Sequence, residues 1–401
     1  MDDRTREQVA AASMPLGRRQ LLAGAGLAGL GAWAGKAGAQ HAKPMPAYVA
    51  WKDPDSMVVH SSSTLETRRG AFGTSVITPA EQLYVRNNLP APDPSILKDR
   101  DGWTVAIEGV KQPRSLTLRE LKTLELQTVA TVLQCSGNGR GFFPSKPSGT
   151  PWTVGAAGCV LWSGVPLKVV AQALGGVAEG MRYITGTGGE KLPEGIDAKS
   201  IIVERSVPLK ALEDAMLVWE MNGAPLSLAH GGPLRLVVPG YQGVNNIKYI
   251  KRLAFSAAET DAKIMSHGYR VSPPGSKADP SQPSVQEMSV KSWINSPTAD
   301  VAAGMVQIHG VAFGGLHAVR RVQVSVDGGS SWNDARFIGP DLGKFAWRQF
   351  VLQARLQPGS YTLASRATDM AGNVQPEARI ENVSGYNNTS WADHAIKLTV
   401  V

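Results

Sequence analysis

The sequence predicts an α+β fold of two domains, and three of its features lead to that prediction. The chain has 401 residues, enough for about two domains that each bury a core. Its 43 glycines and 26 prolines indicate many turns and short elements, with more strand than helix. Residues 271–285 are rich in proline, serine and glycine, which is a linker composition. We therefore expect a mixed α/β domain at residues 76–270 and a second domain at residues 286–401.

Short strands alternate with loops and a few helices in the first of these domains. Residues 116–124 place apolar side chains at helical spacing, and Thr117 is a candidate N-cap. A proline near the start also favours helices at residues 165–174 and 207–211. Residues 234–239 are predicted to form a strand, because a Pro-Gly pair ends their apolar run. No glycine-rich nucleotide loop follows a strand, so nucleotide and nicotinamide cofactors are not indicated.

The second domain is predicted to consist of strands. Residues 319–326 partly alternate between apolar and polar side chains, and the Asp-Gly-Gly run at 327–329 then supplies a hairpin turn. Further strands are predicted at residues 345–352, 361–368 and 395–401. Short strands separated by turn signals are typical of a β-sandwich. We therefore expect an immunoglobulin-like architecture, without the cysteine pair of antibody domains.

The N-terminus has the pattern of an export signal. A twin arginine at residues 18–19 precedes an apolar, glycine-rich stretch at residues 21–35, and small residues at 37–39 offer a cleavage site. Twin-arginine signals direct the export of folded proteins in bacteria, so we expect residues 1–39 to be removed and the mature protein to be periplasmic. An uncleaved anchor is the alternative. Residues 40–75 are predicted to be an irregular arm, and no other stretch is apolar enough to span a membrane.

The net charge of +8 comes from scattered lysines and arginines. No long basic block appears, and aromatic residues are only weakly interleaved with basic ones, so a function in binding nucleic acid is not indicated. The excess of positive charge could instead steer an acidic partner protein toward the chain.

Cys135 is the residue that most favours chemistry. It stands where a threonine- and valine-rich strand runs into a loop of small residues, and Arg140 follows five residues later. An arginine this close can keep the sulfur as a thiolate, which binds soft metals or attacks substrates. The alternative is a buried core cysteine, since free cysteines are commonly buried. Cys159, the only other cysteine, lies in an apolar stretch and is predicted to belong to the core.

Several cations stand at strand ends or beside glycines, namely Arg86, His230, Arg235 and Lys248. Such arginines and lysines could grip a phosphate-bearing cofactor, the arginine through its planar fork and the lysine as a point charge. A solvated cationic surface is the alternative for each of them taken alone. Tyr269, beside Arg270 and just before the linker, could pass protons or bind an anion, or it could pack at a domain join.

Five motifs occur in order along the chain. They are Tyr-Val-Arg-Asn-Asn-Leu-Pro at 84–90, Leu-Gln-Cys-Ser-Gly-Asn-Gly-Arg at 133–140, Trp-Glu-Met-Asn-Gly-Ala-Pro-Leu at 219–226, His-Gly-Gly-Pro-Leu-Arg-Leu-Val-Val-Pro-Gly at 230–240 and Val-Ser-Val-Asp-Gly-Gly-Ser-Ser-Trp at 324–332. In this order they resemble the sulfite oxidase family of molybdenum enzymes, over nearly all of residues 75–401. Within the family, the chain is most similar to the molybdenum subunit of bacterial sulfane dehydrogenases. The resemblance implies a molybdopterin-binding domain followed by a dimerisation domain.

The resemblance also implies one molybdenum held by one molybdopterin, a pyranopterin dithiolene, in a chain without haem. Cys135 matches the cysteine whose thiolate ligates the metal. Arg86, Arg140 and Tyr269 match residues that line the substrate pocket. The positions that match pterin- and phosphate-binding residues are Asn88, His230, Arg235 and Lys248.

Three positions depart from the family pattern. Asn88 stands in place of a histidine, Gly139 in place of the first of two adjacent arginines, and Ser384 in place of an arginine that helps to form the sulfite pocket. The pocket should therefore be less cationic than one built for free sulfite. This permits a larger substrate, such as sulfane sulfur carried on a protein.

The expected function is that of a periplasmic molybdenum oxidoreductase that oxidises a sulfur atom. Because the chain has no haem-binding motif, we expect electrons to pass to a c-type cytochrome subunit. We also expect a homodimer through residues 286–401 and a sulfur-carrier protein as the substrate. Two alternatives stay open: a dehydrogenase of free sulfite, and a non-catalytic exported binding protein in which Cys135 is inert.

Overall fold

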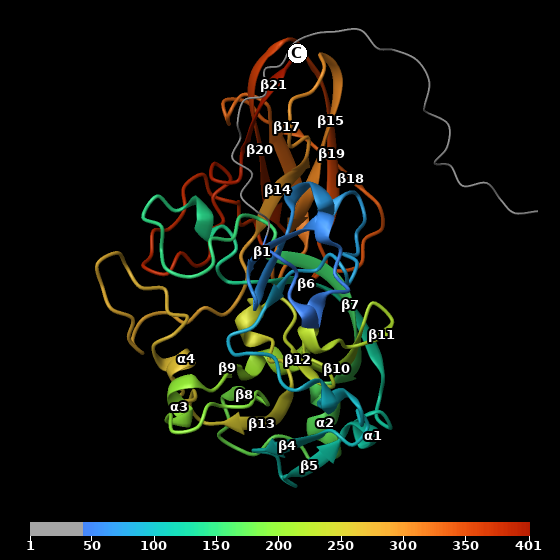
Figure 1. The fold of residues 1–401 in the computed structure, drawn as a ribbon, viewed down its shortest axis with the longest axis vertical. Helices are drawn as coiled ribbons and strands as arrows, with labels where there is room; N and C mark the ends of the chain where they lie inside the picture. The colour runs from blue at the N-terminus through green and yellow to red at the C-terminus, as the bar shows by residue number, and fades with distance from the viewer. Residues whose placement is uncertain (1–42) are drawn as a thin grey trace, which may run out of the picture. The chain divides into compact units, whose positions relative to one another are not determined.

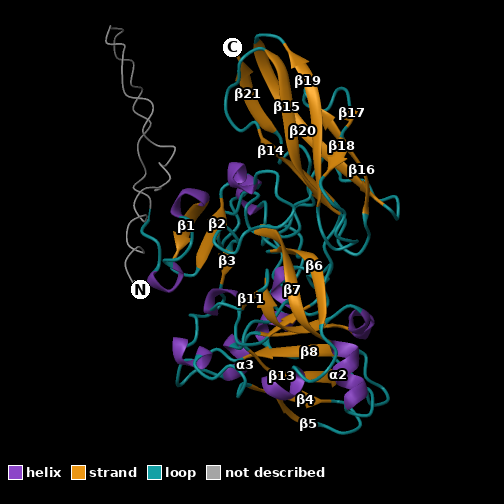
Figure 2. Ribbon diagram, turned by 90° about the vertical axis from the view of Figure 1, so that its right-hand side faces the viewer, coloured by secondary structure: helices purple, strands orange, loops and turns teal. Residues whose placement is uncertain are grey.

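The structure, a computed structural model, describes residues 43–401. The predicted signal peptide at residues 1–39 lies outside the described residues. Within residues 43–401, no helix has the length and apolar character needed to cross a membrane. Mixed sheets with a few short helices come first along the chain and a β-sandwich follows, as Figure 1 and Figure 2 show. The predicted α+β class is therefore confirmed.

One sheet of the first domain has five strands and lies at the lower end of Figure 1. These strands are β4 (Thr104–Glu108), β5 (Arg114–Thr117), β8 (Tyr183–Gly188), β9 (Glu204–Pro208) and β13 (Ile250–Ser256). Their order is β5–β4–β13–β8–β9, and β13 runs parallel to β4 but antiparallel to β8. The domain's α-helices are α1 (Leu118–Leu121), α2 (Leu167–Ala173), α3 (Ala198–Ile201) and α4 (Lys263–Ser266).

Local sequence accounts for how these helices begin. Thr117 caps α1: its Oγ1 accepts from the Glu120 amide at 3.1 Å, and the Glu120 carboxylate accepts from the Thr117 amide at 2.7 Å. The helix is a single turn and shorter than predicted, because it ends at Leu121 and residues 122–124 form a turn. Helix α2 begins directly after Pro166, as predicted. The helix predicted at 207–211 is instead the end of β9 followed by a 3₁₀ turn at Leu209–Glu213.

A second sheet places two of the predicted site residues. Its strands are β6 (Gln127–Gln134), β7 (Ala157–Pro166), β10 (Met216–Met221), β11 (Ala224–Pro225) and β12 (Arg235–Val237). Strand β6 is rich in threonine and valine, residues that suit a pleated and half-buried surface, and it pairs with β7 along its whole length. Cys135 follows β6 directly, and β12 begins at Arg235. The end of one strand and the start of another therefore fix the main chain of these two residues.

The segment predicted to be an irregular arm, residues 40–75, contains regular structure. Strands β1 (Met57–Ser61) and β2 (Thr64–Thr67) form a hairpin, and β2 also pairs with β3 (Val85–Arg86). Met57, Leu65 and Val85 are buried together from these three strands. The prediction missed the hairpin because neither strand alternates clearly between apolar and polar residues. Because of this hairpin, the N-terminal segment supports strand β3, which ends at Arg86.

The second domain consists of two four-stranded antiparallel sheets. One contains β14 (Lys291–Ser296), β15 (Gly304–Phe313), β18 (Arg336–Ile338) and β19 (Arg348–Leu356). The other contains β16 (Val319–Ser325), β17 (Asn333–Asp334), β20 (Gly359–Asp369) and β21 (Ile396–Val400). Ile308 and Phe350 from the first sheet share a buried core with Val322 and Leu363 from the second. The predicted β-sandwich is therefore confirmed.

A shared core joins the two domains. Cys159 of β7 is fully buried there with Trp293 of β14 and Trp347 just before β19. Burial raises the pKa of the Cys159 thiol to about 12, which agrees with its prediction as a core residue. The predicted linker at residues 271–285 contains turns but no helix or strand.

Candidate active site

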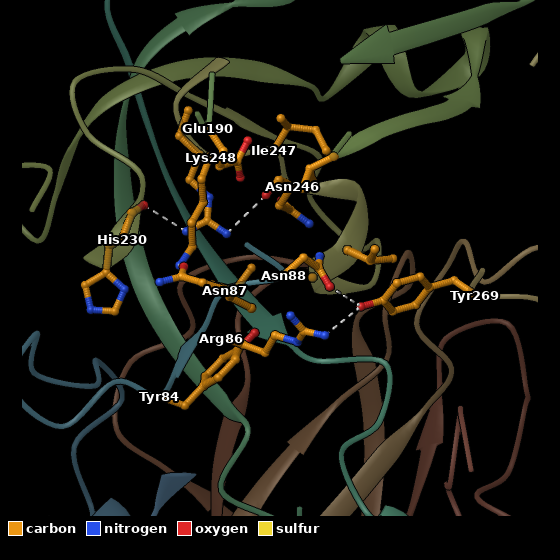
Figure 3. Close-up of a pocket in the computed structure, with 15 residues that line it drawn as sticks. Tyr84, Arg86, Asn87, Asn88, Glu190, His230, Asn246, Ile247, Lys248 and Tyr269 are labelled. Atoms are coloured by element: carbon orange, nitrogen blue, oxygen red, sulfur yellow. Dashed lines mark hydrogen bonds between the residues drawn. The ribbon is translucent and has the colours of Figure 1, made fainter. Parts of the chain in front are cut away.

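Six of the predicted site residues line one cavity. They are Arg86, Asn88, His230, Arg235, Lys248 and Tyr269. Figure 3 shows that they come from different elements, with His230 and Lys248 on one side and Tyr269 on the other. Cys135 and Arg140 are not among the lining residues, but they adjoin this cavity through the contacts described below.

Buried cations form one side of the cavity. Arg235 donates Nη1 to the His230 carbonyl at 3.0 Å and Nη2 to the Asn246 carbonyl at 3.3 Å. Its buried Nε has no hydrogen-bond partner among the described residues. Lys248 donates Nζ to Asn87 Oδ1 at 2.6 Å, and burial lowers its pKa well below the usual value, with Arg235 adding to the effect. Arg235 therefore brings positive charge and a free donor into a buried site, and a bound anion there would stabilise the charged form of Lys248.

His230 is held by a lysine that no sequence pattern marks. Lys52, only 2% exposed, approaches the carbonyls of Ala80 and Leu83 and lies 2.9 Å from His230 Nε2. A protonated ammonium has three donors, so three acceptors satisfy it, and the ring proton of neutral His230 is then on Nδ1. Burial lowers the pKa of Lys52 to about 7, with Glu81 opposing the shift. Burial, followed by the Lys52 charge, lowers the pKa of His230 well below its usual value and keeps its ring neutral.

The cavity has an excess of positive charge that its own residues do not neutralise. Its lining includes Arg86, Arg235 and Lys248, but Glu190 is the one carboxylate among the lining residues. Burial raises the pKa of Glu190 to about 7, so even this carboxyl group is partly protonated at neutral pH. Buried charges cost free energy unless they are paired. An anionic ligand would complete the site.

Arg86, Tyr269 and Asn88 form a hydrogen-bonded chain on the other side of the cavity. Arg86 Nη2 donates to Tyr269 Oη at 3.4 Å, and Tyr269 Oη donates to Asn88 Oδ1 at 3.1 Å (Figure 3). Asn88 is exposed, so the chain reaches from the guanidinium to solvent. Tyr269 has a φ of 53°, a left-handed conformation that is rare in bulky residues and often marks a functional position.

Cys135 lies beside this chain. Burial alone would lower the pKa of Arg86, but the ionisable groups of Tyr269, Cys135 and Tyr386 outweigh it and raise that pKa. The Cys135 amide donates to the Ala156 carbonyl at 2.8 Å, which fixes its main chain. Its side chain is only half-buried, and the thiol has no hydrogen-bond partner among the described residues. An accessible thiol of this kind can ligate a metal, whereas the buried Cys159 cannot.

Arg140 is directed toward main-chain carbonyls. Its Nε donates to the Ser384 carbonyl at 2.7 Å, and its Nη1 donates to the Thr150 carbonyl at 3.1 Å. The guanidinium packs over Gly137, where an added Cβ would come within 2.6 Å of it. The sequence suggested that Arg140 holds the Cys135 thiolate. In the structure, Gly137 instead leaves room for the Arg140 side chain. The hydrogen bonds of Arg140 hold its loop against two other segments.

Residues 384–388 of the second domain contact the Cys135 loop. The Asn387 amide donates to the Ser136 carbonyl at 2.9 Å, and Asn388 Nδ2 donates to the Gly139 carbonyl at 3.0 Å. Gly139 has a φ of 96°, and an added Cβ would meet Asn388 at 2.9 Å, so the glycine suits this close approach. The two domains therefore share the site.

Tyr386, in the same segment, is a residue that the sequence analysis missed. Its ring stacks on that of Tyr269, with centroids 5.2 Å apart and an interplanar angle of 14°. In this segment the sequence pattern singled out only the nearby Ser384. No local pattern could have found Tyr386, because its partner lies in the other domain.

Two protein families match this chain. The family described as the oxidoreductase molybdopterin binding domain matches residues 90–264, and the family described as the Mo-co oxidoreductase dimerisation domain matches residues 282–399. Sulfite oxidase of Arabidopsis thaliana is 30% identical over 356 residues, which cover 81% of this chain and 89% of that protein. Mitochondrial sulfite oxidase of Rattus norvegicus is 32% identical over 347 residues, which cover 82% of this chain but only 62% of that protein.

A solved structure is similar along nearly the whole chain. It is the crystal structure of the sulfane dehydrogenase SoxCD from Paracoccus pantotrophus, with a TM-score of 0.71 and 26% identity. The similarity covers 92% of this chain and 95% of that one. Both its extent and the order of the two matched families agree with the fold described above.

The side chains in the cavity fit an anionic molybdenum cofactor. The unpartnered Arg235 Nε, the buried Lys248 and the charge excess all suit a phosphate-bearing group. Within residues 43–401, no cluster of three or more His, Cys, Asp or Glu side chains could hold a metal ion by itself. A metal beside Cys135 would therefore take most of its ligands from a cofactor, which is the arrangement that a dithiolene provides.

Proposed function

This chain belongs to the sulfite oxidase family of molybdopterin-binding oxidoreductases, and from that premise we propose that it oxidises a sulfur group with a molybdenum cofactor. The observation that carries the proposal is the convergence of three groups at a cation-rich cavity: Arg86 and Tyr269 are hydrogen-bonded to each other, and Cys135 packs against the buried cluster that contains two of the lining residues. When bound through Cys135 and one pterin, molybdenum would supply oxygen-atom transfer and take up two electrons. In the overall reaction the sulfur gains one oxygen from water and loses two electrons, and the water releases two protons.

The cofactor-binding roles follow from the donors that each residue has free. Arg235 Nε and Lys248 Nζ would bind the phosphate, because Arg235 has a buried donor without a partner and the phosphate charge would favour the protonated form of Lys248 that burial alone disfavours. His230 would donate Nδ1–H to the pterin, because Lys52 occupies Nε2. Asn88 would contact the pterin with its side-chain amide.

The substrate roles fall to Arg86 and Tyr269. Arg86 would hold the negative charge of the sulfur group, because its one hydrogen bond among the described residues is a long one to Tyr269. Tyr269 would release its hydroxyl proton to solvent, beside the exposed Asn88 that accepts its hydrogen bond, and would be reprotonated from the substrate side. Arg140 would keep the Cys135 loop in place, and its charge would add to the field around the substrate.

The substrate that we favour is sulfane sulfur bound to a carrier protein. A chain of similar fold along its length is named a sulfane dehydrogenase, and serine at position 384 removes a cation from the pocket pattern. A dehydrogenase of free sulfite is the second candidate, because the curated relatives at 30–32% identity are named sulfite oxidases. In either case electrons would leave to a c-type cytochrome subunit, and two chains would pair through the dimerisation domain.

An assay of the purified protein separates these candidates. Protein from a molybdenum-replete host should contain about one molybdenum per chain, measured by mass spectrometry together with pterin release. It should reduce cytochrome c faster with a carrier protein that bears a cysteine persulfide than with sulfite at equal concentration. Turnover of sulfite alone would favour the second candidate. A metal-free, inactive protein would contradict both and favour a binding protein.

Export by the twin-arginine route is a further part of the proposal. Replacing Arg18 and Arg19 by lysine should keep the protein in the cytoplasm, because the export machinery recognises the arginine pair. Immunoblots of periplasmic and cytoplasmic fractions would measure this. The matched control replaces Arg4 and Arg6 by lysine and should leave export unchanged. An unchanged periplasmic share in the first variant would contradict export by the twin-arginine route.

A further inference from the structure

Arg205 is a buried arginine beside the Tyr269 ring, and the proposed function gives it no role. It belongs to β9, is 1% exposed and is not among the residues that line the cavity, so it does not contact a ligand there. Its guanidinium lies 5.7 Å from the centroid of the Tyr269 ring, within the range of a cation–π contact. Burial lowers the pKa of Arg205 to about 10, so the group stays charged at neutral pH.

The terminal nitrogens of Arg205 hold the segments on both sides of Tyr269. Nη1 donates to the carbonyl of Ile264 at 2.9 Å, and the helix that contains Ile264, α4, ends three residues before Tyr269. Nη2 donates to Ser284 Oγ at 2.8 Å and to the Val285 carbonyl at 3.0 Å. The Val285 amide donates in turn to the Tyr269 carbonyl at 2.8 Å. These contacts surround a residue whose left-handed φ of 53° needs such support in a bulky side chain.

The remaining nitrogen of Arg205 connects this turn to the cofactor side of the cavity. Nε donates to Asn245 Oδ1 at 3.2 Å, and Asn245 Nδ2 donates to the Val285 carbonyl at 3.1 Å. The chain that follows Asn245 lines the cavity and leads to Lys248, the proposed phosphate ligand. Arg205 therefore fixes the Tyr269 turn relative to the segment that would bind the cofactor.

We propose that Arg205 is a positioning residue for the proton transfer that Tyr269 performs. It holds the ring so that the hydroxyl stays between Arg86 and Asn88, the two groups to which it is hydrogen-bonded. Without the guanidinium, the ring loses the cation beside it and the turn loses contacts on both sides. The inference rests on the proposed function and adds to it a residue that acts through Tyr269 and does not touch the substrate.

A double-mutant cycle separates positioning from a general structural role. Arg205→Lys keeps a positive charge but loses the planar fork, and it should lower kcat by about 10–100-fold, because misplacing a catalytic group by about 1 Å can cost about 100-fold. KM should stay nearly unchanged, because Arg86 would still hold the substrate. In the Tyr269→Phe background, which lacks the hydroxyl, Arg205→Lys should cause no further loss. Reduction of cytochrome c by the molybdenum-loaded protein gives both constants.

The turn should still fold in Arg205→Lys, because a neighbouring arginine also attaches it. Arg270 donates Nε to the Met265 carbonyl at 2.9 Å and Nη2 to the Glu259 carboxylate at 3.0 Å. Ser284→Ala is a milder variant, which removes one acceptor of Arg205 and no charge. It should lower kcat by about two- to fivefold, in line with the modest worth of one hydrogen bond. This variant decides the question if Arg205→Lys does not fold.

Tyrosine labelled with ¹³C at Cζ gives a readout that needs no turnover. The chain has eight tyrosines, and the signal that Tyr269→Phe removes belongs to Tyr269. Arg205→Lys should shift or broaden that signal, because the guanidinium beside the ring is lost. Arg69→Lys is the matched control: Arg69 also donates to two main-chain carbonyls, those of Ile294 and His394, and its replacement should affect stability only.

Four results would overturn the inference. They are a wild-type kcat in the folded Arg205→Lys variant, equal losses of kcat in the two backgrounds, an unchanged Tyr269 signal, and the same loss of kcat in Arg69→Lys. If the wild type oxidises no sulfur compound, the proposed function fails, but the Tyr269 signal still shows whether Arg205 positions that ring. The two failures are therefore distinguishable.

Discussion

Replacing Cys135 by serine should abolish molybdenum-dependent turnover while largely sparing the fold. A serine hydroxyl is a harder ligand than a thiolate and stays protonated at neutral pH, so it cannot take the thiolate's place on a soft metal. Loss of groups that only support a metal ligand costs roughly 10–100-fold, so loss of the ligand itself should cost more. Cys135 is half-buried with its thiol unpaired, so the change should shift the melting temperature only slightly. Steady-state assays and circular dichroism would check both parts.

The chain offers a matched control in its other cysteine. Cys159 is fully buried in the core shared by the two domains, and Cys159→Ala should lower stability without affecting turnover. A maleimide reagent should label cofactor-free protein at Cys135 alone, and bound cofactor should protect that thiol. An active Cys135→Ser variant, or labelling of Cys135 that is indifferent to the cofactor, would contradict the assignment.

Local patterns in the sequence were enough to predict much of the fold. Thr117 begins a helix through a capping box, and Pro166 stands directly before another, because both effects act within one turn of the chain. The sandwich strands were predictable because turn residues separate them. The length of α1 was not, since the apolar spacing continues to residue 124 but the chain turns after Leu121.

The site was only partly predictable, because much of it depends on contacts between distant residues. Lys52 and His230 are 178 positions apart, and Arg140 and Ser384 are 244 apart. The five motifs identified which arginines and lysines to examine, but they could not give the direction of Arg140 or the stacking of Tyr386. A motif gives only the residue types. The orientation of a side chain depends on which carbonyl groups and rings the fold places next to it.

Replacing Lys52 by methionine should lower the free energy of unfolding by about 3 kcal/mol, since each buried polar group left unpaired costs about 1–3 kcal/mol. Methionine has a similar length and no donor, so the carbonyls of Ala80 and Leu83 would lose their ammonium partner. His230 would also lose the group that holds its Nε2. The variant should therefore retain less pterin as well as being less stable. Urea denaturation of cofactor-free protein and pterin release after purification would measure the two effects separately.

The stability difference between wild type and Lys52→Met should depend on pH. Burial lowers the pKa of Lys52 from 10.5 in the unfolded chain to about 7 in the folded one. Between these values the unfolded chain binds more protons at this position, so the Lys52 contribution to stability rises with pH from about 7 to 10.5 and is lost as pH falls through 7. Methionine does not titrate, so the stability of the variant lacks this rise with pH. The difference in the free energy of unfolding between the two proteins should therefore increase from pH 7 to pH 9.

A second lysine in the same segment separates this effect from a general loss of charge. Lys43 is exposed and donates to the His60 carbonyl at 2.6 Å, so Lys43→Met should change stability and pterin content little. If Lys52→Met lowers stability but leaves pterin content unchanged, the lysine supports the N-terminal segment and not His230. If it lowers pterin content as well, Lys52 acts on the cofactor site through His230. An anionic cofactor would then raise the pKa of Lys52 and keep the His230 proton on Nδ1, directed at the pterin.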